Sequence, residues 1–158
     1  MSENFYLKCI SENKQIVIDQ CDGNETIGYA VGLFSYISSN FEDWGADEKG
    51  QSTEKTPVKV YEIKNDVFYS QIFSEPNTDV AKSCLTQHQI CSFVDRHRNW
   101  LRPDGYSTFF LFMSKGNCFI TGMSFGANYK LEVFLCQFKN ANTLDVQRYD
   151  RIVVPRLD

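Results

Sequence analysis

The alternation of apolar and polar residues predicts a protein built mainly from β-strands. Residues 4–10 and 15–19 fit two N-terminal strands, because successive side chains of a strand point to opposite faces of a sheet. Residues 58–63 alternate cleanly, and residues 67–73 follow after a polar turn at 64–66. Two such runs joined by a short turn predict a central hairpin.

The last third of the chain predicts a three-stranded antiparallel meander. Its expected strands are 106–114, 118–124 and 129–138, separated by the turns 115–117 and 126–128. The first of these strands is apolar on both faces and should be central. In the third strand, one face is expected to carry Leu131, Val133 and Leu135, and the other Phe134, Cys136 and Phe138. A short closing strand is expected at 151–154, ended by Pro155.

One segment has the period of an amphipathic helix. Thr86 and Gln89 form a capping-box pattern, and Pro103 and Gly105 mark the end. We therefore expect one principal helix at about 87–101. Its apolar stripe should comprise Ile90, Phe93, Val94, His97, Trp100 and Leu101.

Residues 25–39 fit two structures. Their alternation predicts a strand paired with 15–19, whereas the same side chains also form one face of a helix. Gly28 and Gly32 would destabilise such a helix by about 2 kcal/mol relative to alanine, so we favour the strand. Residues 40–57 have no period and are expected to form a loop.

These elements define a single α+β domain spanning 1–158, with a mostly antiparallel sheet and one principal helix. The chain has 158 residues, 42% of them hydrophobic, which suits a buried core. Its start lacks a basic segment followed by an apolar one, so we expect a cytoplasmic protein. The six cysteines are scattered through apolar runs and are expected to be reduced.

The charge is uneven along the chain, and its distribution bears on which class of partner the protein would bind. The total is −4, but residues 1–57 carry ten acids and four bases. A general nucleic-acid binder would be basic, so that class is disfavoured. The loop 40–57 holds an aromatic residue within an acidic rim, which is typical of protein interfaces. The predicted partner-binding residues are Glu42, Asp43, Trp44, Asp47 and Glu48; the alternative is a solvated loop with Trp44 in the core.

Cys84, His88 and Cys91 are spaced so that one helix would place them on a shared face, as zinc ligands require. Thr86 starts the predicted helix after Cys84, and no fourth ligand is evident nearby. We therefore expect these side chains to pack in the core, with no metal. No cofactor is expected either, because the chain lacks a phosphate-binding glycine-rich loop.

Two short segments resemble enzyme motifs. Gly116-Asn117-Cys118 resembles the nucleophile segment of ovarian-tumour-type cysteine proteases, which implies a histidine downstream, whereas His88 and His97 both precede Cys118. Tyr106-Ser107-Thr108 resembles the Ser-Thr strand of ADP-ribosyltransferases. That resemblance implies a nicotinamide pocket with Glu132 orienting the ribose and an upstream arginine, which here would be Arg96, Arg98 or Arg102. The paired glutamate of that family is replaced by Lys130.

The leading hypothesis is a non-catalytic binding or inhibitory protein. In size, charge and layout the chain is similar to bacterial immunity proteins and small phage-encoded antagonists. Such a protein would dock on a basic partner, for example a toxin or a nuclease. The alternatives are a small enzyme, either ADP-ribosyltransferase-like or a cysteine hydrolase, and an accessory or oligomeric structural subunit.

Overall fold

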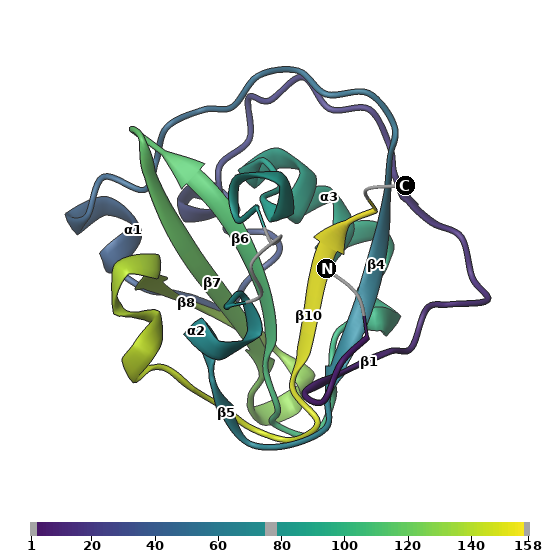
Figure 1. The fold of residues 1–158 in the computed structure, drawn as a ribbon. Helices are drawn as coiled ribbons and strands as arrows, with labels where there is room; N and C mark the ends of the chain where they lie inside the picture. The colour runs from purple at the N-terminus through teal and green to yellow at the C-terminus, as the bar shows by residue number, and fades with distance from the viewer. Residues whose placement is uncertain (1–2, 75–78, 157–158) are drawn as a thin grey trace.

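The computed structural model describes residues 3–74 and 79–156 (Figure 1). The strands are β1 (Leu7–Cys9), β2 (Ile16–Ile18), β3 (Tyr36–Ile37), β4 (Thr56–Ile63), β5 (Val67–Phe68), β6 (Thr108–Ser114), β7 (Asn117–Phe125), β8 (Leu131–Gln137), β9 (Asp145–Val146) and β10 (Arg151–Pro155). The α-helices are α1 (Asn40–Asp43), α2 (Tyr69–Ile72) and α3 (Gln87–Arg96). The 3-10 helices are η1 (Ile27–Tyr29), η2 (Ala81–Ser83), η3 (Arg98–Trp100), η4 (Ala127–Tyr129) and η5 (Phe138–Thr143).

The main sheet confirms the α+β class with one principal helix, but its strand directions are mixed. The strand order is β1-β4-β10-β6-β7-β8-β3, and β2 pairs with the far end of β4. The predicted closing strand, β10, lies in the middle of the sheet between β4 and β6 (Figure 1). It runs parallel to β6, and β3 runs parallel to β8, so two pairings depart from the expected antiparallel arrangement.

Both faces of the sheet are buried, as the pattern of β6 predicts. We call the side that carries Phe110 and Phe112 the first face; it packs under α3 and the irregular segment 27–46. The second face carries Phe109 and Leu111 and packs under α2 and η5. The predicted division of β8 is also confirmed. Leu131, Val133 and Leu135 belong to the first core, while Phe134, Cys136 and Phe138 pack against the second.

The principal helix begins where the capping box predicts and ends earlier than expected. Thr86 Oγ1 accepts a hydrogen bond from the Gln89 backbone N–H at 3.1 Å, and Gln89 Oε1 accepts one from the Thr86 N–H at 2.9 Å. The helix stops at Arg96 because His97 leaves the helical conformation. The His97 ring Nε2 lies 3.0 Å from the Val17 carbonyl oxygen, and the chain continues as η3.

The predicted hairpin of 58–63 with 67–73 is wrong. Strand β4 pairs with β1, β2 and β10, whereas β5 is only two residues long and pairs with β9. The chain turns helical at Tyr69 because Tyr69, Ile72 and Phe73, at helical spacing, are all buried in the second core. The burial of these three side chains on one side of a helical turn outweighs the alternation of apolar and polar residues that predicted a strand.

The predicted strand at 25–39 is wrong as well, and a continuous helix does not form there either. Only η1 and the two residues of β3 are regular, and β3 pairs with β8 and not with 15–19. The Ile27 N–H donates to Gln87 Oε1 at 3.0 Å, which holds this segment against α3. The loop expected at 40–57 contains the short helix α1, and β4 already begins at Thr56.

Candidate functional site

A pocket of about 970 Å³ lies between residues 19–33 and helix α3. Its walls carry four acidic and two basic side chains, a net charge of −2 with His88 neutral. The acids are Asp19, Glu25, Asp47 and Asp95, and the bases are Lys49 and Arg96. We call this pocket the acidic groove.

Helix α3 supplies one wall because His88, Ser92 and Asp95 recur at helical spacing on one side. The other wall is held by hydrogen bonds to that helix. The Gly23 N–H donates to His88 Nδ1 at 3.1 Å. Gly23 has φ +86°, and an added Cβ there would collide with the backbone of Gly50 and Gln51, so glycine is required at this turn.

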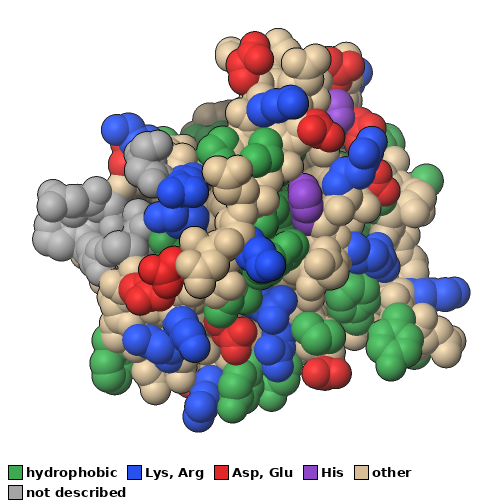
Figure 2. All heavy atoms as spheres, turned by 90° about the vertical axis from the view of Figure 1, so that its right-hand side faces the viewer, with side chains coloured by type: hydrophobic (Ala, Val, Ile, Leu, Met, Phe, Trp, Pro, Cys, Tyr) green, Lys and Arg blue, Asp and Glu red, His purple; other side chains and the backbone are tan. Residues whose placement is uncertain are grey.

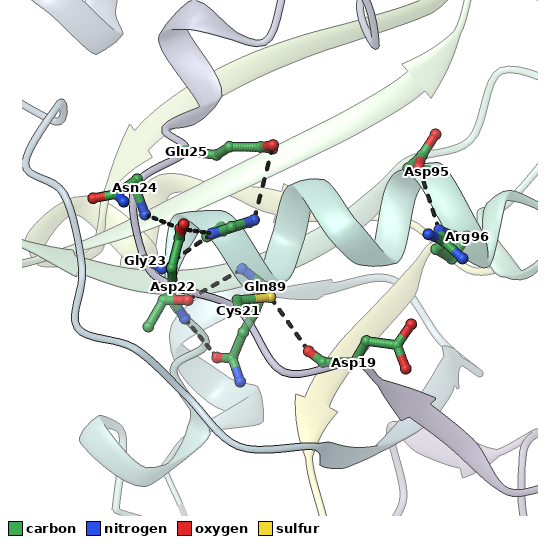
Figure 3. Close-up of polar contacts among 11 residues, drawn as sticks. Asp19, Cys21, Asp22, Gly23, Asn24, Glu25, Gln89, Asp95 and Arg96 are labelled. Atoms are coloured by element: carbon green, nitrogen blue, oxygen red, sulfur yellow. Dashed lines mark hydrogen bonds and ion pairs between the residues drawn. The ribbon is translucent and has the colours of Figure 1, made fainter.

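His88 lies between two carboxylates of this wall. Its Nδ1 is 3.1 Å from Asp22 Oδ1, and its Nε2 is 3.8 Å from Glu25 Oε1. Figure 3 shows Asp22 and Glu25 on the loop that crosses α3, with Asp95 and Arg96 further along the helix. A backbone N–H from Asn24 and the nearby histidine lower the pKa of Asp22. Asp22, which lies next to the groove, is therefore ionised at neutral pH.

The two thiols beside the groove are poor nucleophiles. Cys21 Sγ donates to the Asp19 carbonyl oxygen at 3.3 Å, and burial raises the pKa of this thiol. Burial raises the pKa of Cys91 to about 12. Both thiols are therefore protonated at neutral pH, whereas a cysteine acts as a nucleophile in its thiolate form. The groove thus offers carboxylates, two basic side chains, an imidazole and apolar surface.

Exposed apolar side chains extend the groove. Tyr29 is 77% exposed and Val31 is 78% exposed. Both are apolar side chains that a partner could cover. A second pocket of about 450 Å³ shares Tyr29, Val31 and Asp47 with the acidic groove and reaches Glu42 on α1. The two pockets are therefore neighbours, and their linings together reach from α3 to α1.

The structure brings part of the predicted partner-binding set to these two pockets. Asp47 lines both pockets, although its carboxylate is 3.2 Å from Lys115 Nζ, and Glu42 lines the smaller one. Asp43 is exposed on α1, and Trp44, at the end of α1, is 39% exposed rather than buried in the core. On the face shown in Figure 2, acidic side chains gather near a histidine at the top.

Glu48 lines neither of these two pockets, and its hydrogen bonds connect the loop to neighbouring elements. Its carboxylate accepts a hydrogen bond from the Lys115 N–H, and its own N–H donates to Ser114 Oγ at 3.2 Å. Its carbonyl oxygen accepts from Gln87 Nε2 at 3.2 Å. These bonds tie the loop to β6 and α3. The sequence prediction missed Asp19, Glu25 and Asp95. For Asp95, the polar side of the predicted helix is the signal that could have found it.

The three residues weighed as zinc ligands do not meet. Cys84 packs against the second core, on the other side of the sheet from Cys91 and His88, which both line the acidic groove. Within residues 3–74 and 79–156, no three His, Cys, Asp or Glu side chains are grouped as a metal site requires.

The two enzyme-like segments are also placed differently from the motifs that they resemble. Cys118 packs against the second core, whereas His88 accepts a hydrogen bond from the Gly23 N–H and the His97 ring lies against the Val17 carbonyl oxygen. Thr108 is fully buried, and its hydroxyl accepts a hydrogen bond from the Arg102 N–H at 2.8 Å. Thr108 shares the first face with Phe110, whereas Glu132 points to the second face with Phe134.

No protein-family model, curated protein or solved structure matches this chain. None of the helices in the described part of the chain has the length and apolar character needed to cross a bilayer.

Proposed function

We propose that this chain is a non-catalytic binding protein that docks a basic protein partner in the acidic groove. The observation that carries the proposal is the combination of an acidic hollow with exposed Tyr29 and Val31 at its edge. An inhibitory role, like that of an immunity protein or a phage antagonist acting on a toxin or nuclease, fits this arrangement.

The physical argument rests on two contributions. Exposed carboxylates raise the rate of encounter with a basic partner and set its orientation, but contribute little affinity individually. Desolvated apolar anchors supply most of the binding energy at protein interfaces, and Tyr29, Val31 and Trp44 are the exposed anchors here. Tyr29 ends η1, Val31 lies two residues beyond it, and Trp44 follows α1; these short elements leave the three side chains exposed.

Selection from a random peptide library on the immobilised protein tests the proposal without requiring the partner to be identified first. Bound peptides should be enriched in lysine and arginine next to apolar residues, and their affinity should fall as salt rises. Glu25→Lys combined with Asp95→Lys should raise Kd at least tenfold, because both carboxylates are exposed in the groove.

The matched control reverses two charges away from the groove, with Glu12→Lys and Asp145→Lys. Glu12 lies in the loop between β1 and β2, and Asp145 lies on β9. This control should bind the selected peptides with wild-type affinity. Equal weakening of both double variants, or unchanged binding by the groove variant, would contradict the proposal.

A further inference from the structure

One ring nitrogen of the acidic groove faces two partners that it cannot satisfy together. His88 Nδ1 accepts a hydrogen bond from the Gly23 N–H at 3.1 Å, and the same atom lies 3.1 Å from Asp22 Oδ1. A lone pair on Nδ1 accepts from the amide but repels the carboxylate oxygen. A proton on Nδ1 can be donated to the carboxylate but faces the amide proton. The protonation state of the ring therefore decides which contact forms.

Both partners are held in place by further hydrogen bonds. Asp22 Oδ1 also accepts from the Asn24 N–H at 2.9 Å, which keeps the carboxylate beside the ring. The Gly23 carbonyl oxygen accepts from the Gly50 N–H at 3.0 Å, which ties this turn to the loop that precedes β4. Figure 3 shows Asp22, Gly23 and Asn24 together on the segment that crosses α3. Neither partner can move away from the ring without breaking one of these bonds.

In the neutral ring the contact with Gly23 prevails. A neutral imidazole carries one proton, and because the Gly23 N–H points at Nδ1, that proton belongs on Nε2. Nε2 then faces Glu25 Oε1 at 3.8 Å. The neutral ring thus joins α3 to the backbone of the opposite wall of the groove.

A charged ring meets two carboxylates at close range. Asp22 and Glu25 approach it from the segment that crosses α3, at 3.1 and 3.8 Å. The other charged groups of the groove come from residues 19–33, from the loop 40–57 and from α3 itself: Asp19, Asp47, Lys49, Asp95 and Arg96. Asp95 and Arg96 contact each other. Among the described residues, Asp22 is therefore the carboxylate best placed to accept a proton from Nδ1.

We propose that His88 is a proton-controlled switch that links α3 to the opposite wall of the acidic groove in two alternative ways. The neutral ring accepts the Gly23 N–H, whereas the charged ring releases that N–H and donates to Asp22. The proton comes from solvent, which reaches the ring because the side chain is 18% exposed. Histidine is the side chain whose charge ordinarily changes between pH 5 and 8.

The exchange should weaken the link between α3 and the groove wall in acid. The Gly23 bond involves backbone that Gly50 also holds, whereas Asp22 is 67% exposed, so its ion pair is screened by water and salt. The charged ring also adds one positive charge to the groove lining, whose net charge rises from −2 to −1. A basic partner should therefore bind more weakly in acid, and this last consequence rests on the proposed function.

Nitrogen-15 NMR of the ring and of the Gly23 amide tests the switch. At about pH 8 the ring proton should be on Nε2, and a scalar coupling across the hydrogen bond should join the Gly23 nitrogen to Nδ1. Lowering the pH to about 5 should abolish the coupling, and the Gly23 amide shift should change with the same midpoint as the ring nitrogens. A neutral ring with its proton on Nδ1, or a Gly23 shift that does not follow the ring, would overturn the proposal.

Two variants separate the carboxylate that pairs with the ring from the rest of the groove. Asp22→Asn removes the acceptor of the charged ring, so it should lower the midpoint of the Gly23 change by about half a pH unit or more. Asp95→Asn is the matched control, because residue 95 lies two helical turns from His88, about 10 Å along the axis, where exposed charges are largely screened. It should lower the midpoint by less than about 0.2 unit. Equal displacements in the two variants would count against the switch.

The effect on recognition is measured separately, with the peptides selected on the groove. Their Kd for wild type should rise about twofold to fivefold between about pH 7.5 and about pH 5.5, the contribution of one exposed charge. His88→Asn cannot become charged and offers an amide oxygen near the position of Nδ1, so its Kd should stay constant over this range. A wild-type Kd that does not change with pH would contradict the link between the switch and binding.

The two proposals can fail independently. If no peptide binds in the groove, the proposed function is wrong while the NMR result stands, because the switch requires no partner. If the Gly23 amide does not follow the ring, the switch is wrong even where peptides bind. The two carboxylate variants keep the switch testable if His88→Asn does not fold.

Discussion

Each face of the sheet carries a buried core, but the two cores are covered by different kinds of chain. On the second face, α2 and η5 pack ring against ring, for example Tyr69 against Phe73 and Phe138 with centroids 5.3 and 6.4 Å apart. On the first face, α3 is the one long helix in the described chain, and irregular residues 19–46 complete the cover. That irregular cover leaves a hollow and exposes Tyr29 and Val31. Surface available for recognition thus coincides with the part of the fold that packs least regularly.

The largest expected effects come from removing an aromatic ring from either face. Phe110→Ala and Phe109→Ala should each destabilise the protein by about 3–5 kcal/mol, because both rings are buried and leave cavities. Phe110 packs against Phe93 of α3, and Phe109 packs against Tyr69 of α2. Urea unfolding measures both. A loss of less than about 1 kcal/mol for Phe109→Ala would show that α2 covers the second face only loosely.

A smaller loss is expected at Gly122 of β7. Its partner across the β7–β8 ladder is Phe134, and the Phe134 ring occupies the place where a Cβ on residue 122 would lie. Gly122→Ala should therefore destabilise the protein by about 1–3 kcal/mol, even though alanine normally suits a strand better than glycine.

Gly32→Ala is the matched control for this change. Gly32 lies in the irregular cover of the first face, and a Cβ there would meet no atom within 4 Å. Unfolding in urea should show a change below about 0.5 kcal/mol. Equal losses for the two alanine variants would contradict the contrast between a closed second face and an open first one.

The same contrast explains how far the sequence predicted the fold. Strands β6, β7 and β8 are neighbours in both sequence and space, so their turns and two-faced apolar pattern were sufficient. Strand β4 pairs instead with β1 and β10, which are distant in the sequence, and no local pattern reveals such partners. The alternation in 67–73 was real, but burial of Tyr69, Ile72 and Phe73 selected a helical turn.

The candidate site was predictable only in part, for a related reason. The acidic character of the first third was visible in the composition, and it led to Glu42 and Asp47. The groove itself depends on α3 meeting residues 19–33 through contacts such as Gln87 with Ile27, which are 60 residues apart. Asp95 and Glu25 line the same groove because of that packing. No local sequence pattern reveals a contact between segments so far apart.

A pH-dependent effect is expected at the junction before β10. Asp150 is 5% exposed, and its two oxygens accept hydrogen bonds from the Ser107 and Gln147 N–H groups, each at 2.8 Å. Burial raises the pKa of this carboxyl above its ordinary 3.8. The folded protein therefore holds the proton more tightly, and this stabilisation is complete below pH 3.8 and lost as the pH rises through the folded pKa.

Asp150→Asn provides the reference because its amide does not titrate. The difference in unfolding free energy between wild type and Asp150→Asn should fall with rising pH across that window, by at most about 1.4 kcal/mol per pH unit. The asparagine side chain has one oxygen that can accept from an N–H group where aspartate has two. This loss adds a pH-independent offset to the difference in unfolding free energy. Urea unfolding between pH 3 and 7 measures the slope, roughly the range over which a carboxyl raised by burial titrates. A difference that rises with pH would mean that the two N–H donors dominate over burial.

The smallest effect on stability is expected in the acidic groove. Glu25 and Asp95 are 61% and 62% exposed, and their contacts with His88 and Arg96 are long, at 3.8 and 3.6 Å. The double variant Glu25→Lys with Asp95→Lys should therefore change the free energy of unfolding by less than about 0.5 kcal/mol at neutral pH. If thermal or urea unfolding instead shows a large loss of stability, these acids hold the irregular cover in place. The cover of the first face would then be as firmly packed as that of the second. If stability is unchanged while peptide binding is lost, the acids act in recognition and not in packing.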